Sequence, residues 1–98
     1  MNEMTKELTK EQKKLQKHLL FHIDLRLGSA IEDLPVRDVV DIIDDLYDMI
    51  VEKCKDEDKE FKENILEIYK EKLLNDRYIK EVIRFFPEVE YKIDLLLG

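Results

Sequence analysis

Apolar residues recur at helical spacing along residues 5–19. Leu8, Leu15 and Leu19 share one side of the helix that this spacing predicts, and Thr5 is its predicted N-cap. The opposite side is basic and carries Lys10, Lys13, Lys14 and Lys17. The first element is therefore expected to be an amphipathic helix whose leucines pack on a core.

The hydrophobic period changes over residues 21–27. Apolar and polar positions alternate there, and the alternation returns after Pro87, over residues 89–95. A period of two is typical of a β-strand with one face on the core, so both segments are predicted to be strands. The apolar positions are Phe21, Ile23, Leu25 and Leu27 in the first segment, and Val89, Tyr91, Ile93 and Leu95 in the second.

The two segments belong to a repeat, "FHIDLRLG" at 21–28 and "YKIDLLLG" at 91–98, which we call the twin octapeptides. As neighbouring strands they place Asp24 beside Lys92. Opposite charges then face each other in an antiparallel and in a parallel register alike, so the direction of pairing stays open.

The predicted fold is α+β, mostly helical, with a small two-stranded sheet whose strands lie near residues 20–27 and 88–96. The alternative is an all-α helical bundle. Leucine is a good helix former, and Leu15, Leu19 and Ile23 also continue a helical stripe.

Between the octapeptides the pattern is helical. The apolar residues of a helix over 36–54 cover more than half of its circumference, which predicts a central element covered from more than one direction. A second helix has a core stripe from Phe61 to Leu73. An interruption near Asn75 and a further helical segment up to Pro87 are expected to follow.

Composition predicts one domain over residues 1–98, with 44% hydrophobic residues. No signal peptide is recognised, and no stretch approaches the roughly 20 apolar residues that span a bilayer. The single cysteine, Cys54, is expected to face the core and fits a reducing compartment. We therefore expect a cytoplasmic protein. Because a two-stranded sheet is marginal alone, a homodimer that pairs two sheet edges is also expected.

The net charge of -7 comes from one segment. Residues 31–60 hold twelve acidic residues against four basic ones. Phosphate neutralisation needs clustered lysine and arginine, so this balance argues against direct binding of nucleic acid.

One stretch, "HIDLRLGSAIEDLPVRDVVDIIDDL" at 22–46, together with the second octapeptide, resembles minimal nucleotidyltransferase domains of the toxin–antitoxin type. The resemblance implies a strand that carries two acidic residues and a later strand that carries a third. Asp24 matches the second acidic residue of that motif and Asp94 the third. His22 stands where the first belongs, and no Gly-Ser phosphate-binding motif precedes the strand. Two-metal transfer needs these groups, so the resemblance implies a degenerate or half-size relative.

No catalytic residue, metal site or cofactor is predicted. His18 and His22 have the i, i+4 spacing of a metal pair on a helix, but no third ligand is evident. "DDLYD" at 44–48 has the spacing of the magnesium-binding motif of isoprenyl-diphosphate synthases, and the second Asp-rich helix of those enzymes is missing.

The sequence predicts a small, acidic, non-enzymatic protein that binds a basic surface of a macromolecular partner and inhibits or masks it. Contact with a membrane is not expected. Compact acidic proteins of this kind occur among phage and mobile-element inhibitors, which is an analogy. One alternative is the degenerate nucleotidyltransferase-like domain. Another is that the acidic face meets only water, or the basic face of the first helix. The predicted partner-binding residues are Asp38, Asp41, Asp44, Asp45, Asp48 and Glu52, continued by the acidic residues of 56–60.

Overall fold

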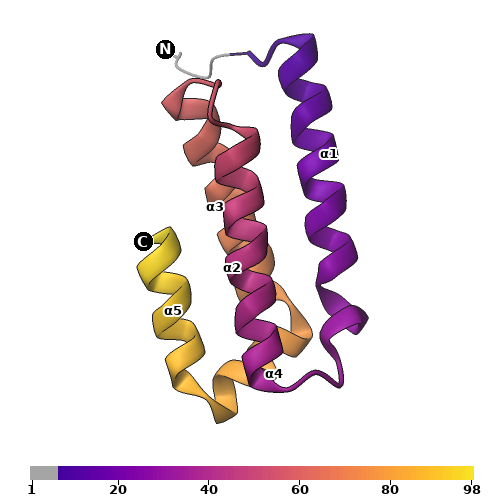
Figure 1. The fold of residues 1–98 in the computed structure, drawn as a ribbon, viewed down its shortest axis with the longest axis vertical. Helices are drawn as coiled ribbons and strands as arrows, with labels where there is room; N and C mark the ends of the chain where they lie inside the picture. Colours follow the sequence, from indigo (N-terminus) through magenta and orange to yellow (C-terminus); the bar gives the residue numbers. More distant parts are fainter. Residues whose placement is uncertain (1–6) are drawn as a thin grey trace.

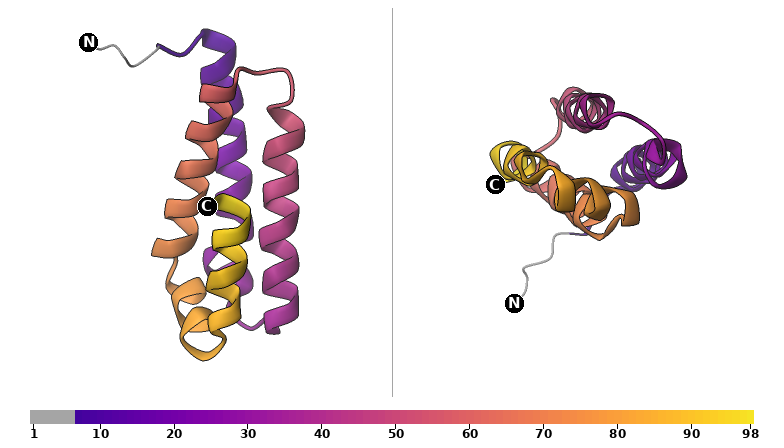
Figure 2. Two further views of the ribbon diagram at one scale, coloured as in Figure 1. Left: turned by 90° about the vertical axis from the view of Figure 1, so that its left-hand side faces the viewer. Right: turned by 90° about the horizontal axis from the view of Figure 1, so that it is seen from below.

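The computed structural model describes residues 7–98, which form an elongated bundle of 42 × 24 × 20 Å (Figure 1). α1, α2 and α3 run along the long axis. α4 turns the chain so that α5 packs beside α2 and α3 (Figure 1 and Figure 2). The elements are α1 (Lys10–Arg26), the short 3-10 helix η1 (Gly28–Ile31), α2 (Val36–Lys53), α3 (Lys59–Asn75), α4 (Arg77–Phe85) and α5 (Pro87–Leu97).

The predicted two-stranded sheet is wrong, and the all-helical alternative agrees with the structure. No residue between 7 and 98 lies in a strand. Residues 20–26 form the last part of α1, and residues 88–96 belong to α5. The fold is therefore all-α instead of α+β.

The alternation of apolar and polar residues suggested strands, but the same pattern also occurs in a helix that has apolar residues on two opposite sides. Residues i and i+4 lie on the same side of a helix, whereas residues i and i+2 point roughly 200° apart. Ile23 and Leu27 are buried, whereas Phe21 and Leu25 are 59% and 55% exposed. α5 repeats this division, with Val89 and Ile93 buried, and Tyr91 and Leu95 66% and 65% exposed.

Pro87 begins α5 instead of preceding a strand. A proline is accepted at the first helical position because its missing N–H would have no intrahelical partner there. The predicted pairing of Asp24 with Lys92 is also wrong. The Asp24 carboxylate lies 2.9 Å from Lys72 Nζ of α3, and Lys92 Nζ lies 3.3 Å from the Asp44 carboxylate of α2.

α1 starts later and ends later than the predicted helix over 5–19. Its N-cap is Thr9, whose Oγ1 accepts a hydrogen bond from the Gln12 backbone N–H at 3.0 Å. Gln12 Oε1 accepts in return from the Thr9 backbone N–H at 3.1 Å, which completes a capping box. The predicted cap, Thr5, lies outside the described residues. The four lysines assigned to the polar side of this helix are all exposed, as predicted.

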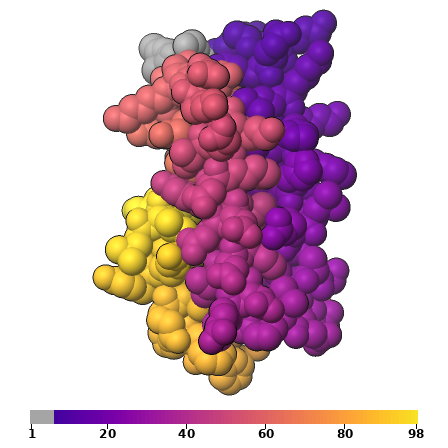
Figure 3. Space-filling model, viewed as in Figure 1, coloured from indigo at the N-terminus to yellow at the C-terminus, as the bar shows by residue number. Residues whose placement is uncertain are grey.

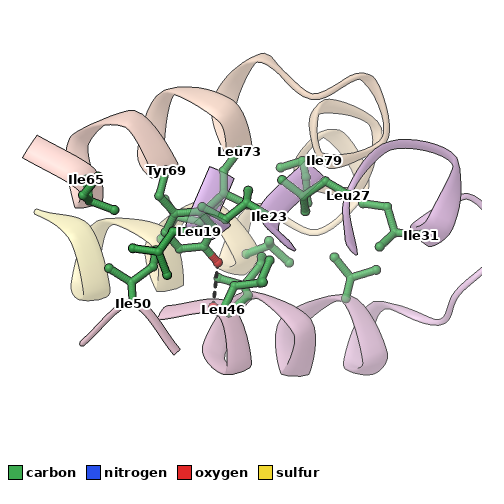
Figure 4. Packing of buried hydrophobic residues seen from close by; sticks show 14 of the residues in the cluster. Leu19, Ile23, Leu27, Ile31, Leu46, Ile50, Ile65, Tyr69, Leu73 and Ile79 are labelled. Carbon is green, nitrogen blue, oxygen red and sulfur yellow. Dashed lines mark hydrogen bonds between the residues drawn. The ribbon is translucent and has the colours of Figure 1, made fainter. Parts of the chain in front are cut away.

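All five helices contribute to one hydrophobic core along the bundle (Figure 4). α2 contacts α1, α3 and α5, so it is covered from more than one direction, as predicted; α3 contacts α1, α2, α4 and α5, so α2 is not the single central element that was predicted. Cys54 is buried at its end, and α3 ends at Asn75, as predicted. Within residues 7–98, no helix has both the length and the apolar character that crossing a bilayer requires.

Two side chains add polar ties between helices. Tyr69 Oη of α3 donates a buried hydrogen bond of 2.7 Å to the Ile43 carbonyl of α2 (Figure 4). The Asp76 carboxylate caps α4 by accepting from the Tyr78 and Ile79 N–H groups, and it also accepts from the Gly28 N–H at 2.8 Å. The end of α1 is thus fixed to the start of α4.

Candidate functional site

An acidic stripe runs along the outer side of α2. Its members recur every three or four residues, so they share one side of the helix. The buried residues of α2 lie on the opposite side, at Val39, Ile43, Leu46 and Ile50. From Asp38 to Glu52 the stripe covers fifteen residues of helix, a rise of about 21 Å. The acidic stripe consists of Asp38, Asp41, Asp45, Asp48 and Glu52, all exposed.

The position of α2 in the bundle leaves the acidic stripe on the surface of the molecule. In the space-filling view, α2 occupies the middle of one broad face, between α1 on one side and α5 on the other (Figure 3). Because α2 packs on three neighbouring helices, its apolar side is held inward and the carboxylates cannot turn away from solvent without unfolding the helix.

Asp44 was predicted to be a partner-binding residue with these five, but it does not belong to the acidic stripe. It is only partly exposed, and its carboxylate forms the ion pair with Lys92 of α5. One residue further along a helix is a rotation of about 100°, so Asp44 points towards α5 while Asp45 points outward. Five of the six predicted residues therefore lie together, and the sixth joins two helices.

Few cations approach the acidic stripe. Arg26 of α1 lies 3.8 Å from the Asp45 carboxylate, and Lys55 lies 2.9 Å from that of Glu52. Both pairs are well exposed and contribute little energy. Asp38, Asp41 and Asp48 form no ion pair with any residue in 7–98.

The basic side of α1 does not cover the acidic stripe. Lys10, Lys13, Lys14 and Lys17 form no ion pair with it among the described residues, and Arg26 is the one α1 side chain that reaches it there. Of the acidic residues after Cys54, Glu57 accepts a hydrogen bond from Gln12 Nε2 at 3.1 Å. Asp58 caps α3 by accepting from the Phe61 N–H at 2.7 Å. Both serve the fold of this end of the bundle.

The described residues offer little chemistry besides charge. His18 and His22 lie on α1 with ring centroids 4.4 Å apart in an edge-to-face contact. Within residues 7–98, no group of three or more His, Cys, Asp or Glu side chains could hold a metal ion. Burial, and then the Glu57 carboxylate, raise the pKa of the Cys54 thiol, which favours the unreactive protonated form.

Asp24 and Asp94, the two residues that the nucleotidyltransferase resemblance singles out, lie on helices. The strand–loop–helix arrangement that the resemblance implied is therefore wrong for residues 20–27, and the later strand is wrong as well. Asp24 pairs with Lys72 of α3, and Asp94 is exposed on α5.

Sequence reasoning missed the exposed apolar pairs of the twin octapeptides. Phe21 and Leu25 on α1, and Tyr91 and Leu95 on α5, were assigned to the core face of strands, yet all four are more than half exposed. Their i, i+4 spacing was the signal that could have identified them as helical surface pairs. None of the protein-family models, curated proteins or solved structures compared with this chain matches it.

Proposed function

We propose that this protein binds a basic surface of a macromolecular partner through the acidic stripe of α2, and that it acts by masking that surface. The observation that carries the proposal is the exposed line of five carboxylates opposite the buried side of α2. The contact needs no catalytic group.

The cost of the acidic stripe to the helix supports a role in binding. Like charges at i, i+4 destabilise a helix by about 0.2–0.5 kcal/mol per pair. Asp38 in the first turn is favoured by the helix dipole, but Glu52 near the C-terminal end is opposed by it. A basic partner relieves this repulsion, whereas water alone screens it only in part.

The proposed mechanism is electrostatic and steric. A line of charge on a helix steers a partner of opposite charge and favours one orientation of the complex. Surfaces that hold nucleic acid are rich in lysine and arginine. Where the partner has such a surface, the acidic stripe occupies the place of the phosphates and competes with them.

A first experiment uses a labelled oligolysine as a defined basic probe. One variant carries Asp41→Asn, Asp45→Asn and Asp48→Asn. The matched control carries Glu63→Gln, Glu67→Gln and Glu71→Gln, three exposed residues of α3. Both variants have the same net charge, so a larger loss of affinity in the α2 variant, measured by fluorescence anisotropy, supports the stripe. Equal losses contradict it.

A second experiment seeks the partner. Immobilised wild-type protein and the two variants capture proteins from the same lysate, and mass spectrometry identifies them. We expect a basic protein to be retained by the wild type and the α3 control and lost from the α2 variant. The captured protein should then release labelled DNA or RNA when the wild type is added. Recovery of the same proteins by all three forms removes the acidic stripe from the mechanism.

A further inference from the structure

The twin octapeptides leave two apolar pairs on the surface of the bundle. Phe21 and Leu25 stand outward on α1, and Tyr91 and Leu95 stand outward on α5. In each pair the two side chains are one helical turn apart, so they form one contact surface. Neither pair belongs to the acidic stripe, and neither is used by the proposed function.

The pair on α1 continues a basic stripe. Lys10, Lys14, Lys17, Phe21 and Leu25 recur every three or four residues, so lysines line the first half of this outer face and apolar side chains the second. Over its length α1 has five basic residues against two acidic ones. An open hollow of about 650 Å³ lies on the same face, lined by Lys14, Lys17, His18, Leu20, Phe21 and Asp24.

The pair on α5 lies among acidic residues. Glu88, Tyr91 and Leu95 share the outer side of this helix, with Glu90 and Asp94 beside them, and all five are exposed. α5 has three acidic residues against one basic residue, Lys92, and that lysine is paired with α2. The outer face of α5 is thus apolar and acidic where that of α1 is apolar and basic.

The two faces lie on opposite flanks of the bundle. α1 and α5 are separated by α2 and α3, and they stand at the two sides of the molecule (Figure 1 and Figure 2). One copy cannot bring its own α1 face to its own α5 face. A second copy can.

We propose that this protein self-associates head to tail, with the outer face of α1 in one copy packed against the outer face of α5 in the next. Phe21 and Leu25 bury against Tyr91 and Leu95, and the lysines of α1 approach Glu88, Glu90 and Asp94. The apolar pairs supply area, and charge selects the partner face. A contact of α1 with α1, or of α5 with α5, sets like charges against each other.

This geometry has a consequence for assembly. A contact between two different faces is heterologous, so it produces rings or open chains instead of a closed two-fold dimer. The acidic stripe lies on a third face, that of α2, and stays exposed in every copy. The assembly then presents several stripes to one partner, which raises avidity.

The test uses two variants that each block one face. Leu25→Glu disables the α1 face, and Leu95→Glu disables the α5 face. The weight-average mass of the wild type, measured by light scattering after size-exclusion chromatography, should rise with concentration above the 11.8 kDa of one chain. Each variant alone should stay at the mass of one chain. An equimolar mixture should reach twice that mass and no more, because one intact α1 face then meets one intact α5 face.

Controls separate this contact from other effects. Phe85→Glu, at a residue of α4 that is 69% exposed and outside both faces, should associate like the wild type. So should the α2 variant with Asp41, Asp45 and Asp48 changed to Asn, which makes failure of this proposal distinguishable from failure of the proposed function. Circular dichroism verifies the helix content of each variant, and Leu25→Gln and Leu95→Gln replace any form that misfolds. A wild type that stays at one chain, association by either variant alone, or a mixture without heterodimers overturns the proposal.

Discussion

The twin octapeptides end two helices with nearly the same residues, yet the two segments are held differently. In the first, the Gly28 N–H donates to the Asp76 side chain, and Asp24 pairs with Lys72. In the second, the Gly98 N–H donates to the Asp94 carbonyl of its own helix. The Asp94 side chain forms no ion pair with any other described residue. Similar residues thus end two helices, but the ties differ: the first octapeptide is held to the C-terminal end of α3 through Asp24 and Gly28, and the second is held to α2 through Lys92.

This comparison separates the features that each octapeptide forms by itself from the contacts that need another helix. Both octapeptides bury the isoleucine, expose the aromatic residue and the leucine that follows it by four, and end on a glycine with φ near +66° to +68°. Glycine adopts this left-handed conformation without the strain that a Cβ introduces. The ties through Asp76 and Lys72 depend on the C-terminal end of α3, whereas the tie through Lys92 depends on Asp44 in the middle of α2.

The largest expected effect is the loss of stability when a buried residue of either octapeptide is truncated, compared with the truncation of an exposed one. Ile23→Ala and Ile93→Ala should each lower the free energy of unfolding by about 2–5 kcal/mol, because each removes a fully buried side chain. Leu25→Ala and Leu95→Ala should change it by no more than about 0.5 kcal/mol. Urea unfolding at low protein concentration measures all four. Equal losses at the inner and outer positions would contradict the division.

The second-largest expected loss of stability follows from removing the Asp76 side chain, which accepts a hydrogen bond from the Gly28 N–H. Asp76→Ala removes the cap of α4 and leaves the Gly28 N–H without its acceptor, which should cost roughly 1–3 kcal/mol. Asp94→Ala, at an exposed residue of α5, should cost less than about 0.5 kcal/mol. Hydrogen exchange of the Gly28 amide should also accelerate in the Asp76 variant. An unchanged exchange rate would mean that the hydrogen bond is not formed in solution.

Tyr69 and Tyr91 form a buried and an exposed pair for comparison. Burial, and then the Asp44 carboxylate, raise the pKa of Tyr69. An unfolded tyrosine loses its proton near a pKa of about 10, so above that pH the folded state binds more protons and its stability falls. Tyr69→Phe should cost about 0.5–1.5 kcal/mol at neutral pH through the lost hydrogen bond and should weaken the alkaline decline. Tyr91→Phe should keep the stability of the wild type in urea unfolding at pH 7.

The smallest expected effect concerns the matching aspartates. Asp24→Asn removes the ion pair with Lys72, in which Asp24 is 61% and Lys72 32% exposed, and should cost no more than about 1 kcal/mol. A double-mutant cycle with Lys72→Met isolates this contribution, which should shrink at high salt. Asp94→Asn should have no coupling with Lys72. A coupling as large as that of Asp24 would remove the distinction between the two octapeptides.

The sequence was a good guide wherever a helix has one apolar stripe. The wide apolar arc of 36–54, the burial of Cys54 and the break near Asn75 are all confirmed. It misled in the octapeptides because apolar residues on both sides of a helix imitate the alternation of a strand. Leu25 and Leu95 could not be assigned to the surface until the other side of each helix was known to face the core.

The candidate site shows the same limit. Its acidic side was readable from the sequence, because Asp38, Asp41, Asp45 and Asp48 recur at helical spacing. The pairing of Asp44 with Lys92 was not readable, because it joins residues of two helices that are nearly fifty positions apart. A rotation of about 100° between Asp44 and Asp45 is enough to give one a structural role and the other an exposed one.

By itself, the sequence determined where the helices around Cys54 and Asn75 lie, that the middle of the chain is acidic, and that two segments would share one local structure. Periodicity and composition set these features, because they depend on neighbours within a few residues. Only the tertiary structure decided that the octapeptides are helical, that their outer leucines reach solvent, and that α1 and α5 stand on opposite flanks. Those outcomes depend on which side of each helix finds a partner, and packing between distant segments is what supplies one.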